Sequence, residues 1–274
     1  MPSGERLDCA RKARQTPQPR MTEPLVSLRN AGKVYPTGTV ALAGFDLEVR
    51  SGEFLTLLGP SGCGKSTVLR LIAGLEEVTS GTLMRGFTFN EASVGFVFQD
   101  PTLMPWASVF DNVYLPLRLC GTPMREAAPA VEKVLALAGL SDFKGAVPRE
   151  LSGGMRMRCS IARALVRRPL LLLMDEPFAA LDEITRFKLN DDILRLQEEL
   201  GMTVVFVTHS VFESVFLSSA IAVMAKRPGR VVAKLPIEAP FPRGMAFRTS
   251  SRYANYCAEV SRALQRAMEG GEPI

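Results

Sequence analysis

Residues 59–67 constrain the possible folds of this chain more than any other segment. The segment reads Gly59, Pro60, Ser61, Gly62, Cys63, Gly64, Lys65, Ser66 and Thr67, which matches the pattern G-x-x-x-x-G-K-[ST] at every position. An apolar run at residues 54–58 precedes it, and a helical pattern of apolar residues follows at 68–73. A strand, a glycine-rich loop and a helix in this order form the context of a phosphate-binding loop. We therefore expect an α/β protein that binds a nucleotide.

The residue types of this loop suit phosphate binding for physical reasons. Glycine carries no Cβ, so successive backbone N–H groups can converge on phosphate oxygens. The N-terminus of the following helix adds a partial positive charge. We expect Lys65 to reach the β- and γ-phosphates and the Ser66 hydroxyl to ligate Mg²⁺. Cys63, inside the loop, is interpreted as a small tolerated side chain, with an oxidation-sensitive switch as the alternative.

Composition and charge narrow the class of protein. A chain of 274 residues, 47% of them hydrophobic, can form one large domain or a domain with a subdomain. Its unbroken apolar runs, such as residues 170–174 and 220–225, fall far short of the roughly 20 residues that cross a bilayer. The net charge of +5 is mild, and we favour a solvated basic surface over binding of nucleic acid or anionic lipid.

The N-terminal segment differs from the rest of the chain. Residues 1–20 carry five basic residues and three prolines but a single large aliphatic side chain, Leu7, and no apolar run typical of a secretory signal. We expect residues 1–21 to form a disordered extension and the functional protein to begin at Met21. The five cysteines lack a C-x-x-C spacing, so neither a disulfide framework nor a zinc site is expected, which fits a reducing cytoplasm.

The remaining pattern predicts an α/β core interrupted by a helical insertion at about residues 106–168. The runs at 170–174 and 203–207 are typical of strands buried on both faces of a parallel sheet. Further strands are expected at 25–30, 45–50, 54–58, 93–99 and 220–225. A C-terminal helix is expected to cover an edge of the core or, as the minor alternative, to meet a partner; its apolar stripe is Tyr253, Tyr256, Cys257, Val260 and Leu264.

Polar side chains follow three of the predicted strands. Asp175 and Glu176 end one strand, His209 follows another and Gln99 a third. Ligands of open α/β sheets lie beyond the carboxyl ends of the strands, so we expect these side chains near the phosphate loop. Asp175 is expected to hold Mg²⁺ through water, and Glu176 to accept a proton from the attacking water. His209 is expected to hydrogen-bond the γ-phosphate, and Gln99 to contact Mg²⁺ or that water.

A second candidate anion site precedes a helical run at residues 156–166. Ser152 is a good helix cap, and Gly153 and Gly154 expose backbone amides at the helix N-terminus. Capping explains the serine but not the paired glycines, which favours an anion. The arginines that follow are interpreted as a solvated face rather than a nucleic-acid patch; they are Arg156, Arg158, Arg163, Arg167 and Arg168.

Together, these motifs resemble those of the ATP-binding cassette (ABC) family of transport ATPases, from about residue 25 to the C-terminus. The resemblance implies a P-loop NTPase core of the RecA type, with an antiparallel β subdomain and an inserted α-helical subdomain. The family's motifs occur here in the expected order. The resemblance implies a Walker A loop at 59–67, the Q-loop at Gln99 and the signature at 151–155. It further implies that Asp175 ends Walker B, that Glu176 is the catalytic base, that the D-loop lies at 179–182 and that His209 is the switch histidine.

The resemblance also implies a homodimer with ATP at its interface. Two ATP molecules would lie between the chains, each held by Lys65 of one copy and by residues 152–154 of the other. Asp182 of the D-loop joins the implied nucleotide-binding residues. Tyr35 falls where the family stacks an aromatic ring on adenine, with a core tyrosine as the alternative. The residues alone indicate only two separate anion sites in one chain.

A narrower resemblance is to bacterial nitrate, sulfonate and taurine importers. It rests on residues 98–106, on Met155 in the signature, and on the segments 227–230 and 240–243. Such ATPases are peripheral subunits on the cytoplasmic face of the inner membrane. They drive a separate membrane permease, which a periplasmic solute-binding protein supplies. Residues 103–109 would face the permease, and Trp106 within them belongs either to that contact or to the core.

Two features depart from the family pattern. Met155 replaces the usual glutamine of the signature, which we expect to be tolerated because the phosphate contacts come from Ser152 and neighbouring amides. Residues 81–95 are shorter than in the family, which puts a hairpin there in doubt. We expect an ATPase domain at 22–235, with its helical subdomain at about 100–168, and a helical extension at 236–274 that is too short for an added regulatory barrel.

The sequence therefore predicts the ATP-hydrolysing motor subunit of a bacterial importer, which binds ATP and Mg²⁺ and no nucleic acid. A soluble ABC ATPase that acts on nucleic acid or ribosomes is less favoured, because such proteins usually carry two cassettes or a long coiled-coil insertion. A nucleotide-gated regulatory protein is disfavoured by the presence of Glu176 and His209. The sequence does not specify the transported solute.

Overall fold

Two sheets and the helices around them make up the described part of the chain. The computed structural model describes residues 24–90, 93–226 and 228–269, so the extension expected at 1–21 lies outside it. The strands are β1 (Val26–Val34), β2 (Val40–Val49), β3 (Phe54–Leu58), β4 (Ser80–Arg85), β5 (Val94–Val97), β6 (Leu171–Asp175), β7 (Thr203–Thr208), β8 (Ala220–Ala225) and β9 (Arg230–Pro236). The α-helices are α2 (Lys65–Ile72), α3 (Val109–Leu119), α4 (Met124–Leu137), α5 (Gly153–Leu165), α6 (Glu183–Leu200), α7 (Val211–Leu217), α8 (Met245–Arg248) and α9 (Ser251–Met268).

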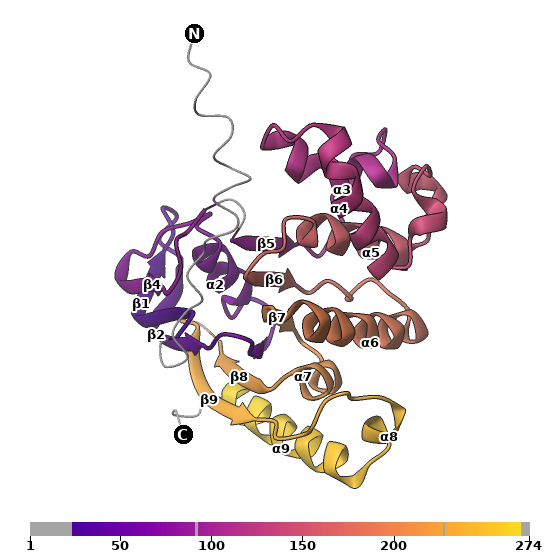
Figure 1. The fold of residues 1–274 in the computed structure, drawn as a ribbon. Coiled ribbons are helices and arrows are strands. Elements are labelled where there is room, and N and C mark those ends of the chain that lie inside the picture. The colour runs from indigo at the N-terminus through magenta and orange to yellow at the C-terminus, as the bar shows by residue number, and fades with distance from the viewer. Residues whose placement is uncertain (1–23, 91–92, 227, 270–274) are drawn as a thin grey trace.

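The larger sheet is the α/β core that the sequence predicts. Its strand order is β5-β6-β7-β3-β8-β9, and every pair is parallel except β8 and β9. Leu171 and Leu173 point into one hydrophobic cluster, whereas Leu172 and Met174 point into the other. Figure 1 shows why both faces are covered, because α2 and the smaller sheet lie on one side and α5, α6 and α7 on the other. Strands enclosed in this way need apolar residues at every position.

The smaller sheet is antiparallel, in the order β2-β1-β4. It confirms the β subdomain that the family resemblance implies. β1 runs on to Val34 through register shifts near Ala31 and Lys33, so it is longer than the expected strand at 25–30. Within the described residues, β4 pairs with β1 and not with a hairpin partner of its own. The sequence did not reveal β4 because most of its side chains are exposed and carry no alternating pattern.

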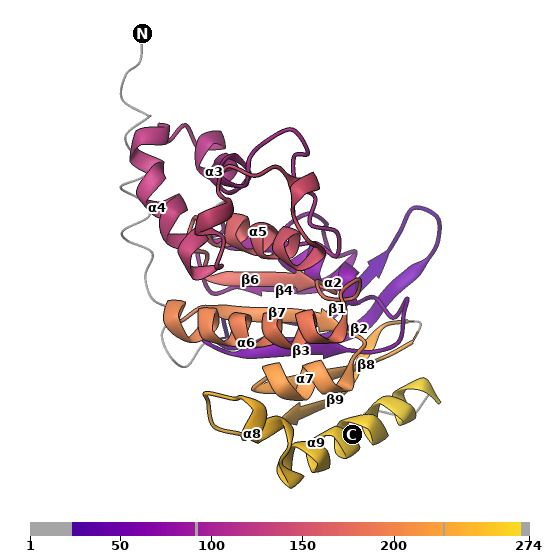
Figure 2. The ribbon, with the colours of Figure 1, turned by 90° about the vertical axis from the view of Figure 1, so that its right-hand side faces the viewer.

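The helices α3, α4 and α5 form a group at one end of the larger sheet, shown from the side in Figure 2. They lie within the helical insertion that the sequence predicts. Ser108 begins α3 as its cap, since its hydroxyl accepts a hydrogen bond from the backbone N–H of Asp111 at 3.0 Å. Among the described helices, none is long and apolar enough to cross a bilayer.

The C-terminal helix α9 packs on α7 and β8. Tyr253, Cys257 and Val260 of its predicted stripe are buried in the larger hydrophobic cluster. The interpretation that this helix covers the core is therefore confirmed. The preceding strand β9 was missed from sequence, because an edge strand with Lys234 and Pro236 does not show the uninterrupted apolar run of its neighbours.

Arg243 fastens the C-terminal extension to the core. Its guanidinium is buried and donates hydrogen bonds to carbonyl oxygens at the end of α7 and after β9; these belong to Val215, Phe216, Ser218, Ile237 and Ala239, at 2.8 to 3.2 Å. The side chain also lies over the ring of Phe241 at 4.2 Å. Burial lowers the pKa of Arg243 to about 10. The arginine therefore adds five hydrogen bonds between two segments that are otherwise joined by the backbone hydrogen bond from Ile237 to Ser219 and by the β8–β9 pairing.

Replacing this arginine should destabilise the protein. Arg243→Ala leaves several buried carbonyl oxygens without a donor, so we expect a loss of roughly 2–4 kcal/mol in the free energy of unfolding, measured by denaturant titration. Arg262→Ala, on the exposed face of α9, is the matched control and should change this quantity by less than about 0.5 kcal/mol. Equal stability of the two variants would contradict the fastening role.

Candidate nucleotide-binding site

The glycine-rich loop connects β3 to α2, as the sequence predicts. Gly62 and Gly64 have φ values of +76° and +93°, in the left-handed region that favours glycine. The loop wraps around Lys65, which is 5% exposed. Its Nζ donates to the carbonyl oxygens of Gly59 at 2.8 Å and Pro60 at 3.1 Å. This geometry holds a cation in the middle of a ring of backbone groups.

The loop opens onto a pocket of about 290 Å³ at the carboxyl ends of the parallel strands. Three of the predicted residues line it together, namely Gln99, Asp175 and Glu176, beside every loop residue from Ser61 to Thr67 except the buried Cys63. The structure thus brings together side chains that are more than 100 residues apart in the sequence. Open α/β sheets bind ligands at this edge.

Asp175 and Ser66 form the oxygen-rich part of this pocket. The Ser66 hydroxyl donates to Oδ1 of Asp175 at 2.9 Å. Burial raises the pKa of the Asp175 carboxyl, and the hydrogen bond from Ser66 acts in the opposite direction. A hydroxyl, a carboxylate and the amide oxygen of Gln99 are the hard oxygen ligands that Mg²⁺ prefers. The donor set therefore fits the metal that the sequence predicts.

Glu176 lies between Lys65 and His209. Its Oε1 is 3.6 Å from Nζ of Lys65, and its Oε2 is 3.3 Å from Nδ1 of His209. The backbone N–H of Glu176 donates to the carbonyl of Val207 at 3.0 Å. Its φ of +45° is unusual for a residue with a side chain. The carboxylate is therefore held over the loop by the backbone as well as by its two partners.

Tyr35 lies beside the pocket and is not one of its lining residues. Its hydroxyl is 3.2 Å from Oγ1 of Thr67 and donates to Oε1 of Glu76 at 3.2 Å. Lys33 is over the ring, with Nζ 5.4 Å from the centroid. The tyrosine is partly exposed rather than a core residue. Its expected contact with adenine stays a prediction.

Three residues at the start of β2 and just before it also line the pocket, and no motif in the sequence indicated them. They are Thr39, Val40 and Ala41. Gly229 secures this segment, since its N–H donates to the carbonyl of Ala41 at 2.9 Å and a Cβ on it would lie 2.2 Å from the carbonyl oxygen of Cys63. The glycine of the segment 227–230 therefore has a packing role beside the loop.

The second predicted anion site lies outside this pocket. Ser152 is exposed and caps α5, accepting a hydrogen bond from the N–H of Met155 at 3.3 Å. A Cβ on Gly154 would lie 2.6 Å from Cγ2 of Thr185, so packing alone requires that glycine. Asp182 caps α6 by accepting a hydrogen bond from the N–H of Thr185 at 2.9 Å. The argument that paired glycines favour an anion is therefore weaker than it was from sequence.

The expectation of a solvated arginine face on α5 is wrong for two members. Arg158 is half-buried and pairs with Asp192 at 2.6 Å. Arg163 donates to the backbone oxygens of Pro101 and Thr102, both at 2.8 Å, and to the Thr102 hydroxyl at 2.9 Å. Burial lowers the pKa of Arg163. These partners lie 34 and 61 residues away in the sequence, which is why helical spacing alone did not reveal them.

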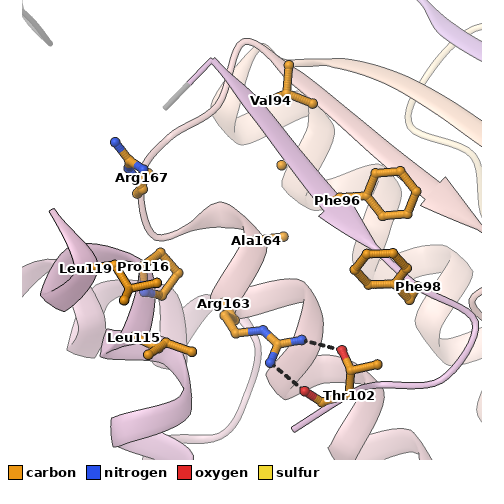
Figure 3. Close-up of a pocket in the computed structure, with 11 residues that line it drawn as sticks. Val94, Phe96, Phe98, Thr102, Leu115, Pro116, Leu119, Arg163, Ala164 and Arg167 are labelled. Carbon is orange, nitrogen blue, oxygen red and sulfur yellow. Dashed lines mark hydrogen bonds between the residues drawn. The ribbon is translucent and has the colours of Figure 1, made fainter. Parts of the chain in front are cut away.

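A second hollow, of about 590 Å³, separates β5 from the helical group. Figure 3 shows Phe96 and Phe98 on one side, Leu115 and Leu119 on the other, and Arg163 reaching across to Thr102. Leu119 is 78% exposed. Trp106, on the segment between Gln99 and α3, is 79% exposed, so the alternative that it is a core residue is wrong.

Comparison with known proteins identifies the family. Residues 42–179 match the family model described as ABC transporter. The chain belongs to the ABC transporter family. It is therefore an ATP-binding cassette that hydrolyses ATP, and the expected P-loop fold with an inserted helical group is confirmed.

Relatives and solved structures agree with this assignment. An aliphatic sulfonates import ATP-binding protein, SsuB 1 of Pseudomonas syringae pv. syringae, is 41% identical over 90% of this chain and 99% of that protein. An uncharacterized ABC transporter ATP-binding protein of Methanocaldococcus jannaschii is 43% identical over 82% of this chain and 84% of that protein. A dimeric ATP-binding cassette bound to ADP and Pi has a TM-score of 0.68 and 32% identity, covering 78% of this chain and 100% of that one. The expected resemblance to sulfonate-type importers is thus confirmed.

Burial of Cys63 decides between the two interpretations of this residue. The side chain is 0% exposed, and burial raises the pKa of its thiol. Since the thiolate is the reactive form, a buried thiol with a raised pKa reacts slowly. We expect iodoacetamide to label Cys63 at least about tenfold more slowly in the native chain than in guanidinium, measured by peptide mass spectrometry. Rapid native labelling would restore the redox-switch alternative.

Proposed function

We propose that this chain is the motor subunit of a bacterial importer for a small anionic solute of the sulfonate type. The observation that carries the proposal is the position of Glu176, which lines one pocket with Lys65 and contacts His209, in a cassette whose relatives are named sulfonate importers. ATP is the substrate. The loop amides and Lys65 bind its β- and γ-phosphates, and Tyr35 stacks on its base.

Catalysis rests on positioning and charge, because phosphoryl transfer has a loose transition state. Ser66, Asp175 and Gln99 would hold Mg²⁺, which when bound neutralises charge on the phosphate oxygens. Glu176 accepts the proton of the attacking water, and its left-handed backbone directs the carboxylate over the loop. His209 hydrogen-bonds the γ-phosphate and, through its 3.3 Å contact, fixes the orientation of Glu176.

The active form is a head-to-tail homodimer in our proposal. Ser152, Gly153 and Gly154 lie outside the pocket of their own chain, so they are available to a nucleotide held by a second copy. Asp182 belongs to the same interface. Similarity to dimeric cassette structures supports this arrangement. Binding of ATP closes the dimer, and hydrolysis reopens it.

The membrane partner is a separate permease that docks on residues 103–109 and the hollow beside them. The exposed rings of Trp106 and Phe98 and the exposed side chain of Leu119 provide an apolar surface for a helix of the permease. We place the subunit on the cytoplasmic face of the inner membrane, with a periplasmic solute-binding protein supplying the permease. The domain limits of 22–235 and 236–274 are part of this proposal.

Two variants test the chemistry. Glu176→Gln keeps the shape of the side chain but cannot accept a proton, so we expect kcat to fall by roughly 100-fold or more while ATP still binds and the dimer accumulates on sizing chromatography. Lys65→Ala should instead weaken nucleotide affinity itself, measured with a fluorescent ATP analogue. Turnover that survives Glu176→Gln would remove the proposed base, and unchanged affinity in Lys65→Ala would remove the phosphate contact.

A surface variant tests the docking of the permease. Trp106→Ala removes an exposed ring that no packing requires, so ATPase activity of the purified subunit should stay within about twofold of wild type. Uptake of solute by cells, and the fraction of subunit that sediments with membranes, should both fall. Met84→Ala, an exposed apolar residue on β4, is the control and should leave all three quantities unchanged. Normal uptake with Trp106→Ala would contradict this docking surface.

A further inference from the structure

A buried carboxylate lies behind His209 and takes no part in the chemistry proposed above. Glu213, in the first turn of α7, is only 6% exposed. Its Oε2 accepts a hydrogen bond of 2.5 Å from the hydroxyl of Thr208, the residue before His209. The same hydroxyl accepts a hydrogen bond from the N–H of Ser210 at 3.0 Å. Glu213 therefore holds the backbone on both sides of His209.

The second oxygen of this carboxylate faces Arg186 on α6. Oε1 of Glu213 is 3.4 Å from Nε of Arg186. That Nε is buried and has no hydrogen-bond acceptor among the described residues, so Glu213 is the charge that compensates it. A buried carboxylate such as Glu213 is costly unless it is paired with a positive charge. Removal of Arg186 would therefore leave the charge of Glu213 uncompensated.

The far end of Arg186 reaches the 179–182 loop. Its Nη2 donates to the carbonyl oxygen of Leu181 at 2.9 Å. Leu181 and Thr185 in turn pack against the glycines that begin α5. A Cβ on Gly153 would lie 3.2 Å from Cδ2 of Leu181, and one on Gly154 only 2.6 Å from Cγ2 of Thr185. A shift of this loop would therefore displace the residues at the N-terminus of α5.

These contacts follow one another without a gap. The route runs from the His209 segment through Glu213 and Arg186 to the loop at 179–182 and the N-terminus of α5. In Figure 1 and Figure 2, α7, α6 and α5 lie in this order along the same face of the larger sheet. Only the step between Glu213 and Arg186 is an ion pair between side chains.

We infer that Glu213 is a positioning residue that, through Arg186, links the placement of His209 to the placement of the glycines at the start of α5. The inference rests on the proposed function, in which His209 serves the ATP bound by its own chain and the glycines serve the ATP of the partner copy. The ion pair then makes the two nucleotide sites of the dimer adjust together. ATP affinity, set by the loop at 59–67, does not depend on it.

A double-mutant cycle tests this link in the full-length chain. Glu213→Gln keeps the hydrogen bond to Thr208 but removes the charge, and Arg186→Gln removes the opposite charge. We expect each variant to lower kcat by about 10- to 100-fold with KM for ATP within about threefold of wild type. The double variant should be no slower than the slower single variant, because both remove the same interaction.

Asp192→Asn is the matched control. It breaks the half-buried ion pair with Arg158, which also joins α5 to α6 but lies off the route. Its kcat should stay within about twofold of wild type, although its thermal midpoint falls. If Glu213 had only a structural role, Glu213→Gln and Asp192→Asn would both lose activity only in proportion to the fraction of unfolded protein.

Several outcomes would overturn the inference. The inference fails if kcat is unchanged in Glu213→Gln, or if a rise in KM for ATP accounts for the lower activity of that variant. It also fails if the effects of the two substitutions on kcat are additive in the double variant. If Glu213→Gln does not fold, Arg186→Gln and Thr208→Val carry the same test, and full kcat in both would refute the link. Absence of turnover in the unchanged chain would instead contradict the proposed function itself.

Discussion

Parallel pairing of β3, β6 and β7 is the constraint on which the rest of the structure depends. The register places Leu58 beside Thr208 and Asp175 beside Val207, so all three strands end at the same level of the sheet. Each residue that follows a strand end is thereby delivered to one edge. The short distances from Glu176 to Lys65 and His209 follow from that alignment rather than from any local motif. Both faces pack in dense hydrophobic clusters, so a slip by one residue would exchange side chains of different shape between the clusters and disrupt the packing.

Charged side chains, buried or partly buried, then fasten the peripheral segments to this core. Arg243 binds carbonyl oxygens from two segments, Arg163 holds the segment after Gln99, and Glu213 holds the segment around His209. Arg243 and Glu213 are buried and Arg163 is partly buried, and each makes hydrogen bonds to groups of another segment. Such contacts contribute less to net stability than apolar packing of equal size, but they fix direction as well as distance. Arg163 and Glu213 hold segments that carry or flank the site, whereas Arg243 holds the C-terminal extension.

The sequence revealed the site because its chemistry is concentrated at strand ends. The runs before Asp175 and His209 are long, apolar and uninterrupted, so both the strands and the polar residues beyond them could be predicted. Strands with partly exposed side chains, such as β4 and β9, carry no comparable pattern and were missed. Side-chain pairing across long separations was also inaccessible, as Arg163 and Glu213 illustrate. Whether an aromatic residue is buried depends on neighbours that pattern alone does not identify, which is why Trp106 could not be placed in advance.

The left-handed backbone at Glu176 sets the stability of the fold against the proposed catalytic role of this residue. This conformation costs a residue with a Cβ about 1–2 kcal/mol of free energy, whereas glycine adopts it without that penalty. Glycine at this position would therefore give a more stable fold, but it would remove the carboxylate. A library of this chain selected for heat tolerance alone would be enriched in glycine at this position, and, under the proposed role of Glu176, its most stable members would be the least able to consume ATP.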